Sequence, residues 1–298
     1  MKVLKGLGLG LLGFLLYVSL STFALVFMMN STVLNPQFVA SEIGRLDISA
    51  IAKDVIRQQF QLPPEIAKFA MPLVDETLVE LKPWINQQVN TAIYSGYDYL
   101  LGKSQEFKIT IQTEPAKEAI KKNLRKALLE SPPPELQQLP QAMRDQLLNQ
   151  IEQQFSAQIP STFTVDRSMI GADGMTVLQQ ARQVIGYIQS AYTWLIALIV
   201  ILALGIALIH HQVRGATRAL GITSLTCGVI NYASFFLLNY LAPTQIPQAG
   251  LPAQLGVWLT QFITDLVAPV QTFNLALVAI GVVLLIVSFV YGPSSAKA

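Results

Sequence analysis

Four long apolar runs dominate the pattern of hydrophobic and polar positions along the chain. An α-helix rises 1.5 Å per residue, so about 20 apolar residues cross a hydrocarbon core of about 30 Å. Each run is about that long and has no charged residue well inside it, although the third carries several Thr, Ser and Asn residues. The pattern therefore predicts a mainly α-helical membrane protein with four transmembrane helices, at residues 1–29, 190–209, 219–241 and 270–291.

The first apolar run also has features of a secretory signal peptide. Lys2 and Lys5 precede it, and Thr22 with Ala24 offers small residues for cleavage. The run continues to Met29, however, beyond the about 7 to 15 residues that are typical of a signal peptide's apolar core. We therefore expect an uncleaved membrane anchor and leave cleavage as the alternative.

Residues 30–189, between the first two spans, change to an amphipathic pattern with Pro and Gly as breaks, which predicts an α-rich domain. The helix over residues 64–102 contains Pro72 and Pro83, which we expect to kink or split it. The last helix begins near Gly174 and runs without a break into the second span, ending at Ile209. The helices expected before it are at residues 37–61, 64–102, 115–130 and 141–158, the last with Met143, Leu147, Ile151 and Phe155 facing inward.

Two short segments of this domain alternate between apolar and polar residues, the period of a half-buried β-strand. Phe107, Ile109 and Ile111 are the apolar positions of the first segment. A second segment, residues 162–165, has the same character about fifty residues later. We predict that the two strands pair into a small two-stranded β element.

The loop between the third and fourth spans, residues 242–268, contains an amphipathic stripe around Trp258. Its apolar positions are Leu255, Trp258, Leu259, Phe262, Ile263 and Leu266. This pattern is typical of an interfacial helix, which either lies flat on the outer leaflet or packs beneath the large domain. The sequence leaves both arrangements open.

Charge then sets the expected orientation. The chain is 52% hydrophobic and 13% charged, and residues 30–189 hold nearly all of its acidic side chains. The few basic residues outside that segment flank the spans on one side, at Lys2, Lys5, Arg214, Arg218 and Lys297. By the positive-inside rule we expect a multi-pass protein of the cell membrane with both termini cytoplasmic and residues 30–189 outside.

The strongest local charge feature is a basic helix within residues 115–130. It carries Lys117, Lys121, Lys122, Arg125 and Lys126. A solvated helix face is the plain interpretation, and contact with anionic lipid head groups or an acidic partner is the alternative. We expect no binding to nucleic acid, because the domain faces outward and is slightly acidic in sum.

Small and polar residues in the spans predict helix packing. Gly8, Gly10 and Gly13 match G-x-G-x-x-G, but no strand precedes them, so a dinucleotide site is not expected. Gly6, Gly10 and Gly13 lie on one face, a spacing that lets membrane helices approach closely. Asn231 and Asn274 are expected to hydrogen-bond to neighbouring helices, with a role in lining a pathway as the alternative.

No combination of residues specifies a reaction, cofactor or metal. His210 and His211 are adjacent, so they point about 100° apart on a helix and do not chelate one ion from one face. Cys227 is the only cysteine. An outward-facing enzyme would depend on the carboxylates Asp75, Glu76 and Glu80, which we interpret as a solvated helix face.

The order of spans and loops resembles that of claudins and, more loosely, of FtsX-type permeases. The first outer loop contains Trp84 as its single tryptophan and no cysteine, whereas claudins carry W-x-x-W with two cysteines there. FtsX-type permeases work with a cytoplasmic ATPase, for which the short inner segments offer little surface. The resemblance therefore covers topology and implies neither family's function.

The sequence thus predicts a non-enzymatic envelope protein in the lipid bilayer. We expect a sensor, scaffold or accessory subunit whose outer domain binds a protein partner. A channel or transporter component formed by self-association is the alternative, because the third span is polar and the first has a glycine face.

Overall fold

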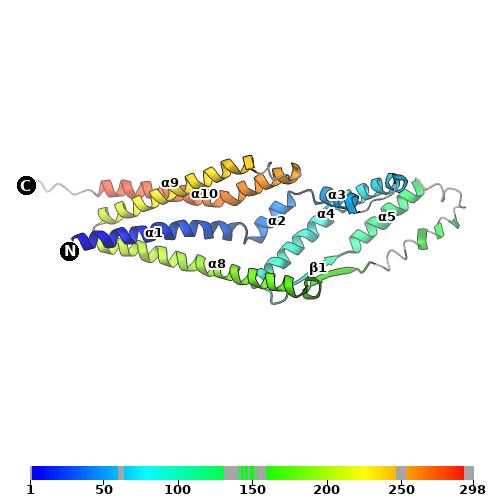
Figure 1. Ribbon diagram of the computed structural model, residues 1–298, viewed down its shortest axis with the longest axis horizontal. Helices are drawn as coiled ribbons and strands as arrows, with labels where there is room; N and C mark the ends of the chain where they lie inside the picture. The colour runs from blue at the N-terminus through cyan, green and yellow to red at the C-terminus, as the bar shows by residue number, and fades with distance from the viewer. Residues whose placement is uncertain are drawn as a thin grey trace, which may run out of the picture. The chain divides into compact units, whose positions relative to one another are not determined.

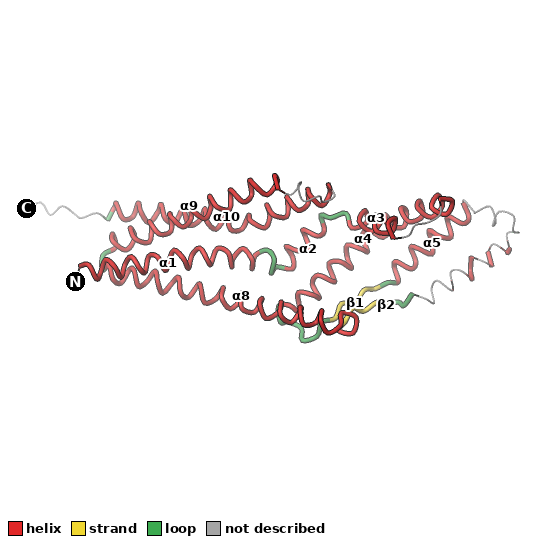
Figure 2. The backbone as a smooth tube through the Cα atoms, viewed as in Figure 1, coloured by secondary structure: helices red, strands yellow, loops and turns green. Residues whose placement is uncertain are grey.

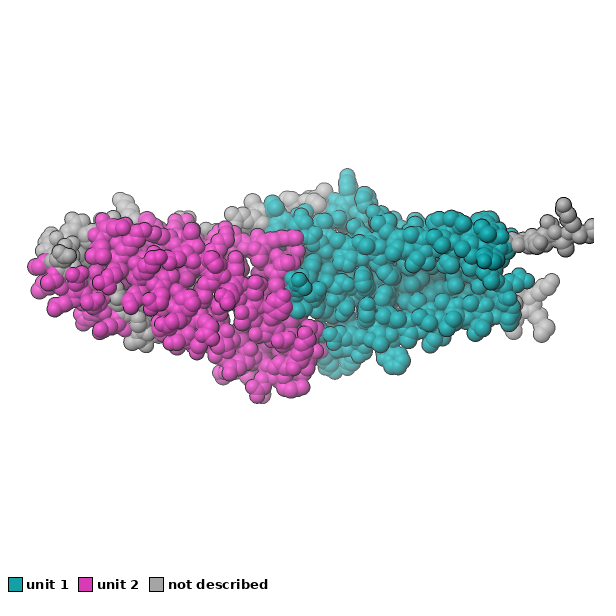
Figure 3. Space-filling view, turned by 180° about the vertical axis from the view of Figure 1, so that it is seen from behind, with its two compact units in different colours: residues 1–39, 183–298 teal, residues 40–182 magenta. Residues whose placement is uncertain are grey.

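The computed structural model describes residues 2–59, 64–130, 159–245 and 253–291, together with residues 140, 142, 143, 145, 146, 148–150 and 153. These residues belong to two compact units (Figure 3). Unit 1 comprises residues 1–39 and 183–298, and unit 2 comprises residues 40–182. The described elements are mainly helical, with two short strands (Figure 2).

Four helices are long and apolar enough to cross a membrane. They are α1 (Lys2–Ser31), α8 (Arg167–His210), α9 (Val213–Gln245) and α10 (Ala253–Val290), shown in Figure 1. Their length and composition indicate a multi-pass membrane protein, as the apolar runs predict.

Helix α8 begins seven residues before the expected start at Gly174. Gly171 interrupts it with φ 74° and ψ 178°, a conformation open to glycine because it has no Cβ. The first turn is capped by Asp166, whose Oδ1 accepts hydrogen bonds from the backbone N–H and the hydroxyl of Ser168, at 2.8 and 2.6 Å. Beyond Gly171 the helix continues to His210. His211 then takes φ 48° in the turn to α9.

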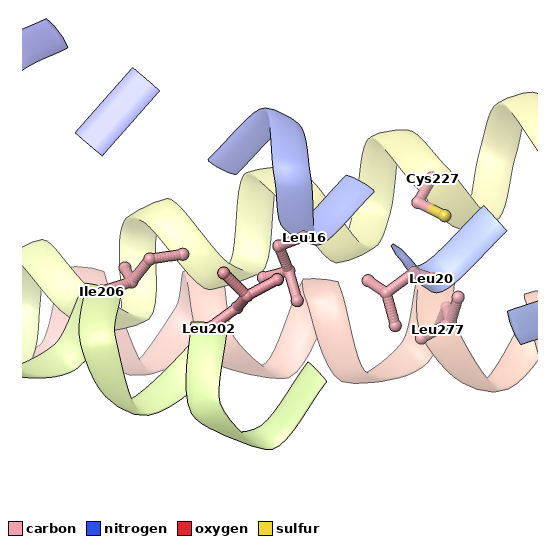
Figure 4. Packing of buried hydrophobic residues seen from close by; sticks show 6 residues of the cluster. All are labelled: Leu16, Leu20, Leu202, Ile206, Cys227 and Leu277. Atoms are coloured by element: carbon pink, nitrogen blue, oxygen red, sulfur yellow. The ribbon is translucent and has the colours of Figure 1, made fainter. Parts of the chain in front are cut away.

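Interdigitated side chains from all four spanning helices form the core of unit 1. Figure 4 shows the buried cluster of Leu16, Leu20, Leu202, Ile206, Cys227 and Leu277. A second cluster joins Ala24 of α1 to Val267 and Val270 of α10. Phe23 links these layers, because its ring lies 5.4 Å from that of Phe273 and 5.2 Å from that of Tyr192. The four spans therefore meet in one packed bundle.

Helices α9 and α10 form the largest helix–helix contact. Glycines permit their close approach. A Cβ on Gly281 would lie 2.7 Å from the backbone nitrogen of Leu225, and a Cβ on Gly221 would lie 3.0 Å from the carbonyl oxygen of Gly281. Small residues let membrane helices pack backbone to backbone, which strengthens dispersion contacts.

The amphipathic stripe around Trp258 and the fourth span belong to one helix, α10, where we expected an interfacial helix and a separate span. Pro269 lies inside this helix without ending it. Proline is tolerated in membrane helices when neighbours satisfy the freed backbone group, so the residue is a weak helix stop there. The stripe is anchored in the bundle, because Thr264 donates a hydrogen bond to Asn239 of α9 at 3.0 Å.

Unit 2 is built mainly from helices of very different lengths. Short helices α2 (Pro36–Gly44) and α3 (Ile48–Gln59) lie where one or two short helices were expected, over residues 37–61. They lead to α4 (Pro64–Leu100), which continues through Pro72 and Pro83 without splitting, whereas the expected kink at these residues stays a prediction. Helix α5 (Glu114–Glu130) packs on α4. Most of residues 141–158 lie outside the described residues, but Met143 is 57% exposed, so its expected inward orientation is wrong.

The predicted strand pair is confirmed. Strand β1 (Lys108–Gln112) pairs antiparallel with β2 (Thr162–Asp166), and Ile109 lies opposite Val165. One residue past the ladder, the backbone N–H of Thr113 donates to the carbonyl of Ser161 at 3.0 Å. The indole N–H of Trp84 donates to the carbonyl of Gln112 at 2.8 Å, so the sheet is fastened to α4.

Arg182 fastens the end of α4 to α8 within unit 2. Its guanidinium carbon lies 4.9 Å from the ring centroid of Tyr99, a cation–π contact, and its Nη2 donates to Gln105 Oε1 at 3.4 Å. Gly102, at φ 77°, provides the turn that brings this loop close. Arg182 thereby holds α8 against the end of α4 and the loop that leads to β1.

Candidate functional sites

The basic cluster of α5 meets an acidic face of α4. Lys122 Nζ donates to Glu80 Oε1 at 2.8 Å, one turn away from an ion pair between Lys126 and Glu76. Asp75 pairs in turn with Lys53 at 2.5 Å. These carboxylates therefore lie in ion pairs of unit 2, and their side chains keep 37–49% of their surface exposed, in line with the expected solvated helix face.

Asn123 is the buried centre of this α4–α5 contact, with 2% of its surface exposed. Its Nδ2 donates to Thr77 Oγ1 at 3.2 Å and to Glu80 Oε2 at 3.0 Å. Asn123 was not among the residues predicted from the sequence. Its position among the lysines of α5 is a signal that could have pointed to this contact. A polar side chain that is buried normally has hydrogen-bond partners on a neighbouring element.

The ion pairs shift the pKa values of their members. The hydrogen bond from Lys122, followed by that from Asn123, holds the pKa of Glu80 below its ordinary value of 4.5. The hydrogen bond to Glu76 raises the pKa of Lys126 above 10.5. Both groups are thus held in their charged forms at neutral pH.

The other predicted cations occupy different surroundings. Lys117 is buried, with 8% of its surface exposed, and its ammonium reaches Glu114 Oε2 at 3.1 Å. Lys121 and Arg125 line an open depression of about 490 Å³ on α5, whose rim includes the half-exposed Leu129. The remaining lining residues are Glu118, Lys122, Lys126 and Glu130. This α5 depression combines net positive charge with an apolar side chain.

A second hollow, of about 370 Å³, lies between α1 and α9 in the membrane bundle. We call it the α1/α9 groove. Tyr17, Ser21 and Thr22 line it from α1, and Asn231 and Ser234 line it from α9. Its apolar lining consists of Val18, Leu25 and Phe235. The groove has no charged lining residue among those the structure describes.

Asn231 organises the polar side of the α1/α9 groove. Its Nδ2 donates to Ser21 Oγ at 3.1 Å and to Cys227 Sγ at 3.3 Å. Ser21 Oγ also lies 3.4 Å from Cys227 Sγ, so the three groups form a triangle across two helices. Sequence reasoning singled out Asn231 and missed Ser21, although Tyr17 and Ser21 are polar positions one helical turn apart on the first span.

The predicted packing glycines contribute little within the chain. A Cβ on Gly6 or Gly10 would have nothing within 4 Å, and one on Gly13 would lie 3.7 Å from Thr223 Oγ1. Contact through Gly6 and Gly10 between two chains stays a prediction. Asn274 is completely buried, and no described residue hydrogen-bonds to either end of its amide.

Trp258 packs inside unit 1. Its ring stacks on Phe262 with centroids 5.2 Å apart, and Phe262 in turn lies 6.0 Å from Phe38 of α2. The rings of Trp258, Phe262 and Phe38 thus form a row that joins α10 to α2. Lipid or partner contact through Trp258 stays a prediction.

The described residues include no group of three or more His, Cys, Asp or Glu side chains arranged to hold a metal ion. The structure therefore offers two candidate binding surfaces, the α5 depression and the α1/α9 groove. Comparisons with known proteins add no further assignment: no family model, curated protein or solved structure matches the chain.

Proposed function

We propose that the chain is a non-enzymatic membrane scaffold or accessory subunit of the cell envelope, whose unit 2 binds a partner. The observation that carries this proposal is that the opposite charges of α4 and α5 form ion pairs between the two helices. Glu76, Glu80, Lys122 and Lys126 stabilise the pairing of two helices. The lowered pKa of Glu80 also does not suit a general acid or base, which works best with a pKa near the operating pH.

The proposed topology places unit 2 outside the cell. Four spans put both termini on one side of the bilayer, and the segment between the first and second spans on the other. Arg214 and Arg218 follow the second span on the same side as Lys2 and Lys5. The positive-inside rule supports a cytoplasmic location for that side.

The α5 depression is the proposed contact surface. Lys121 and Arg125 provide hydrogen-bond donors with positive charge, and Leu129 provides apolar area at 53% exposure. Arginine and exposed apolar side chains are enriched at protein interfaces. The matching partner surface is acidic with an apolar centre.

A cross-linking experiment in membranes tests this proposal. A photo-reactive amino acid at Leu129 should yield one defined adduct, and the double variant Lys121→Glu/Arg125→Glu should reduce its yield at least about tenfold through charge repulsion. The double variant Lys103→Glu/Lys108→Glu is the charge-matched control on another surface. Equal adduct yields from Lys121→Glu/Arg125→Glu and from this control would contradict the proposal.

A channel component formed by self-association is the second candidate. The polar lining of the α1/α9 groove supports it, because hydroxyl and amide groups at membrane depth often line pathways. Reconstituted protein should then carry a solute or ion flux that Ser234→Leu abolishes by filling the groove. A monomer that carries no flux in liposomes would exclude this candidate.

A further inference from the structure

The polar groups of the α1/α9 groove lie near the middle of the bilayer. Asn231 is four residues past the midpoint of the spanning stretch Val213–Leu241, a displacement of about 6 Å along the helix. Ser21 is displaced by about 4 Å from the midpoint of Gly6–Ser31, also toward the C-terminal end. The two positions agree, so the groove opens within the hydrocarbon core.

The NH2 group of the Asn231 amide is hydrogen-bonded within the described part of the bundle, whereas its carbonyl oxygen is not. Nδ2 bonds Ser21 and Cys227, whereas Oδ1 has no hydrogen-bond partner among the described residues. A polar group without a partner in hydrocarbon is costly, since no water is present to replace the missing bond. A ligand in the groove that carries a hydrogen-bond donor would remove this cost.

The lining restricts the chemistry of such a ligand. No charged side chain among the described lining residues would neutralise a phosphate or an ammonium group at this depth. Val18, Leu25 and Phe235 offer apolar contact to a hydrocarbon chain, and Tyr17 offers an aromatic face. The volume, about 370 Å³, falls within the range of small-molecule sites.

We propose that the α1/α9 groove binds an uncharged long-chain alcohol of the membrane. The hydroxyl donates to Asn231 Oδ1, and the hydrocarbon chain lies along Val18, Leu25 and Phe235. A charged lipid is excluded because its head group stays at the interface. This proposal is independent of the proposed function of unit 2, since no residue of the groove belongs to that unit.

The test uses the full chain in phosphatidylcholine nanodiscs that contain a photo-reactive long-chain alcohol. Mass spectrometry should locate the adducts on α1 around Ser21 and on α9 around Ser234. The methyl ether of the same probe lacks the donor, and its labelling of these positions should be lower by about fivefold to tenfold. That ratio corresponds to one hydrogen bond of about 1–1.4 kcal/mol.

Two variants and one control separate binding from folding. Asn231→Leu removes the acceptor and should abolish the difference between alcohol and ether. Ser234→Leu fills the groove without touching the triangle of Ser21, Cys227 and Asn231, so it should prevent labelling by both probes. Thr272→Val removes an exposed hydroxyl of α10 that donates to the carbonyl of Ala268 in the same helix, and should change nothing.

Three results would overturn the proposal. Equal labelling by alcohol and ether would show that the hydroxyl is not recognised. Labelling spread evenly over the lipid-facing helices would show that the groove is not a site. A cross-link from the groove to a second protein chain would identify a helix as its occupant.

Discussion

Gly228 of α9 lies directly against the backbone of Asn274 of α10. A Cβ on Gly228 would be 2.8 Å from the Asn274 carbonyl oxygen and 2.9 Å from the backbone nitrogen of Val278. Carbon atoms do not approach backbone atoms that closely, so any side chain there must push the two helices apart. The close approach of α9 and α10 at this point therefore depends on the absence of a side chain at Gly228.

Gly228→Ala should destabilise the bundle by about 1–3 kcal/mol, the usual cost of overpacking a well-packed core. Thermal unfolding in detergent, followed by far-UV circular dichroism, should show a Tm that is lower by several degrees. Gly10→Ala is the matched control, because its Cβ would have nothing within 4 Å. A Gly228→Ala protein as stable as Gly10→Ala would contradict this account of the α9–α10 contact.

Asn123→Ala should loosen the α4–α5 pair. The substitution removes two hydrogen bonds and leaves Glu80 with a reduced set of donors, a loss of about 2–3 kcal/mol because one partner is charged. Hydrogen exchange of α5 amides should increase by one to two orders of magnitude. Asn90→Ala, an exposed asparagine of α4, serves as the control. Unchanged exchange in α5 would disprove the role of Asn123.

The α4–α5 pair should also weaken in acid. The pKa of Glu80 is lowered in the folded chain, so its contribution to stability is present above about 4.5. It is lost as the pH falls from there through the lower folded pKa. Glu80→Gln should flatten the pH dependence of α5 exchange in this window and leave it unchanged at pH 7 to 8, apart from a constant offset. A Glu80→Gln profile parallel to that of the wild type would argue against this linkage.

The proposed orientation is open to labelling in intact cells. Cys227→Ser removes the only native thiol, and new cysteines at Lys103 and Gln212 then report on unit 2 and on the turn between α8 and α9. An impermeant maleimide should label Lys103→Cys in intact cells, and Gln212→Cys only after permeabilisation. The reverse pattern would invert the topology and with it the proposed location of the partner.

The hydrophobic pattern was sufficient to predict the elements that depend on one segment of the chain alone. The alternation at Ile109 and Ile111 predicted β1, and the uncharged runs predicted the spans, because both patterns follow from solvent contact along one segment. The stripe around Trp258 and the fourth span were predicted as separate elements because one is amphipathic and the other apolar, whereas Pro269 between them does not end helix α10. In a bundle its neighbours compensate for the missing donor.

The contacts between segments were not predictable in the same way. Glu76 and Glu80 have the spacing of a solvated face, and nothing local distinguishes that face from one that meets lysines 42 to 50 residues later. The glycines show the same limit. Gly6 and Gly10 form a recognised spacing, yet the close approach occurs at Gly221, Gly228 and Gly281, since it depends on which helices become neighbours.

The pairing of β1 with β2 has a consequence for how this molecule tolerates change. Its last rung places Gln112 opposite Thr162, so the segment between them begins and ends at neighbouring positions of unit 2. Helix α5 itself is held to α4 by ion pairs, so its sequence is constrained by that contact. We therefore expect insertions and deletions to be tolerated best in the stretch between α5 and β2, whose change in length need not separate the two strands.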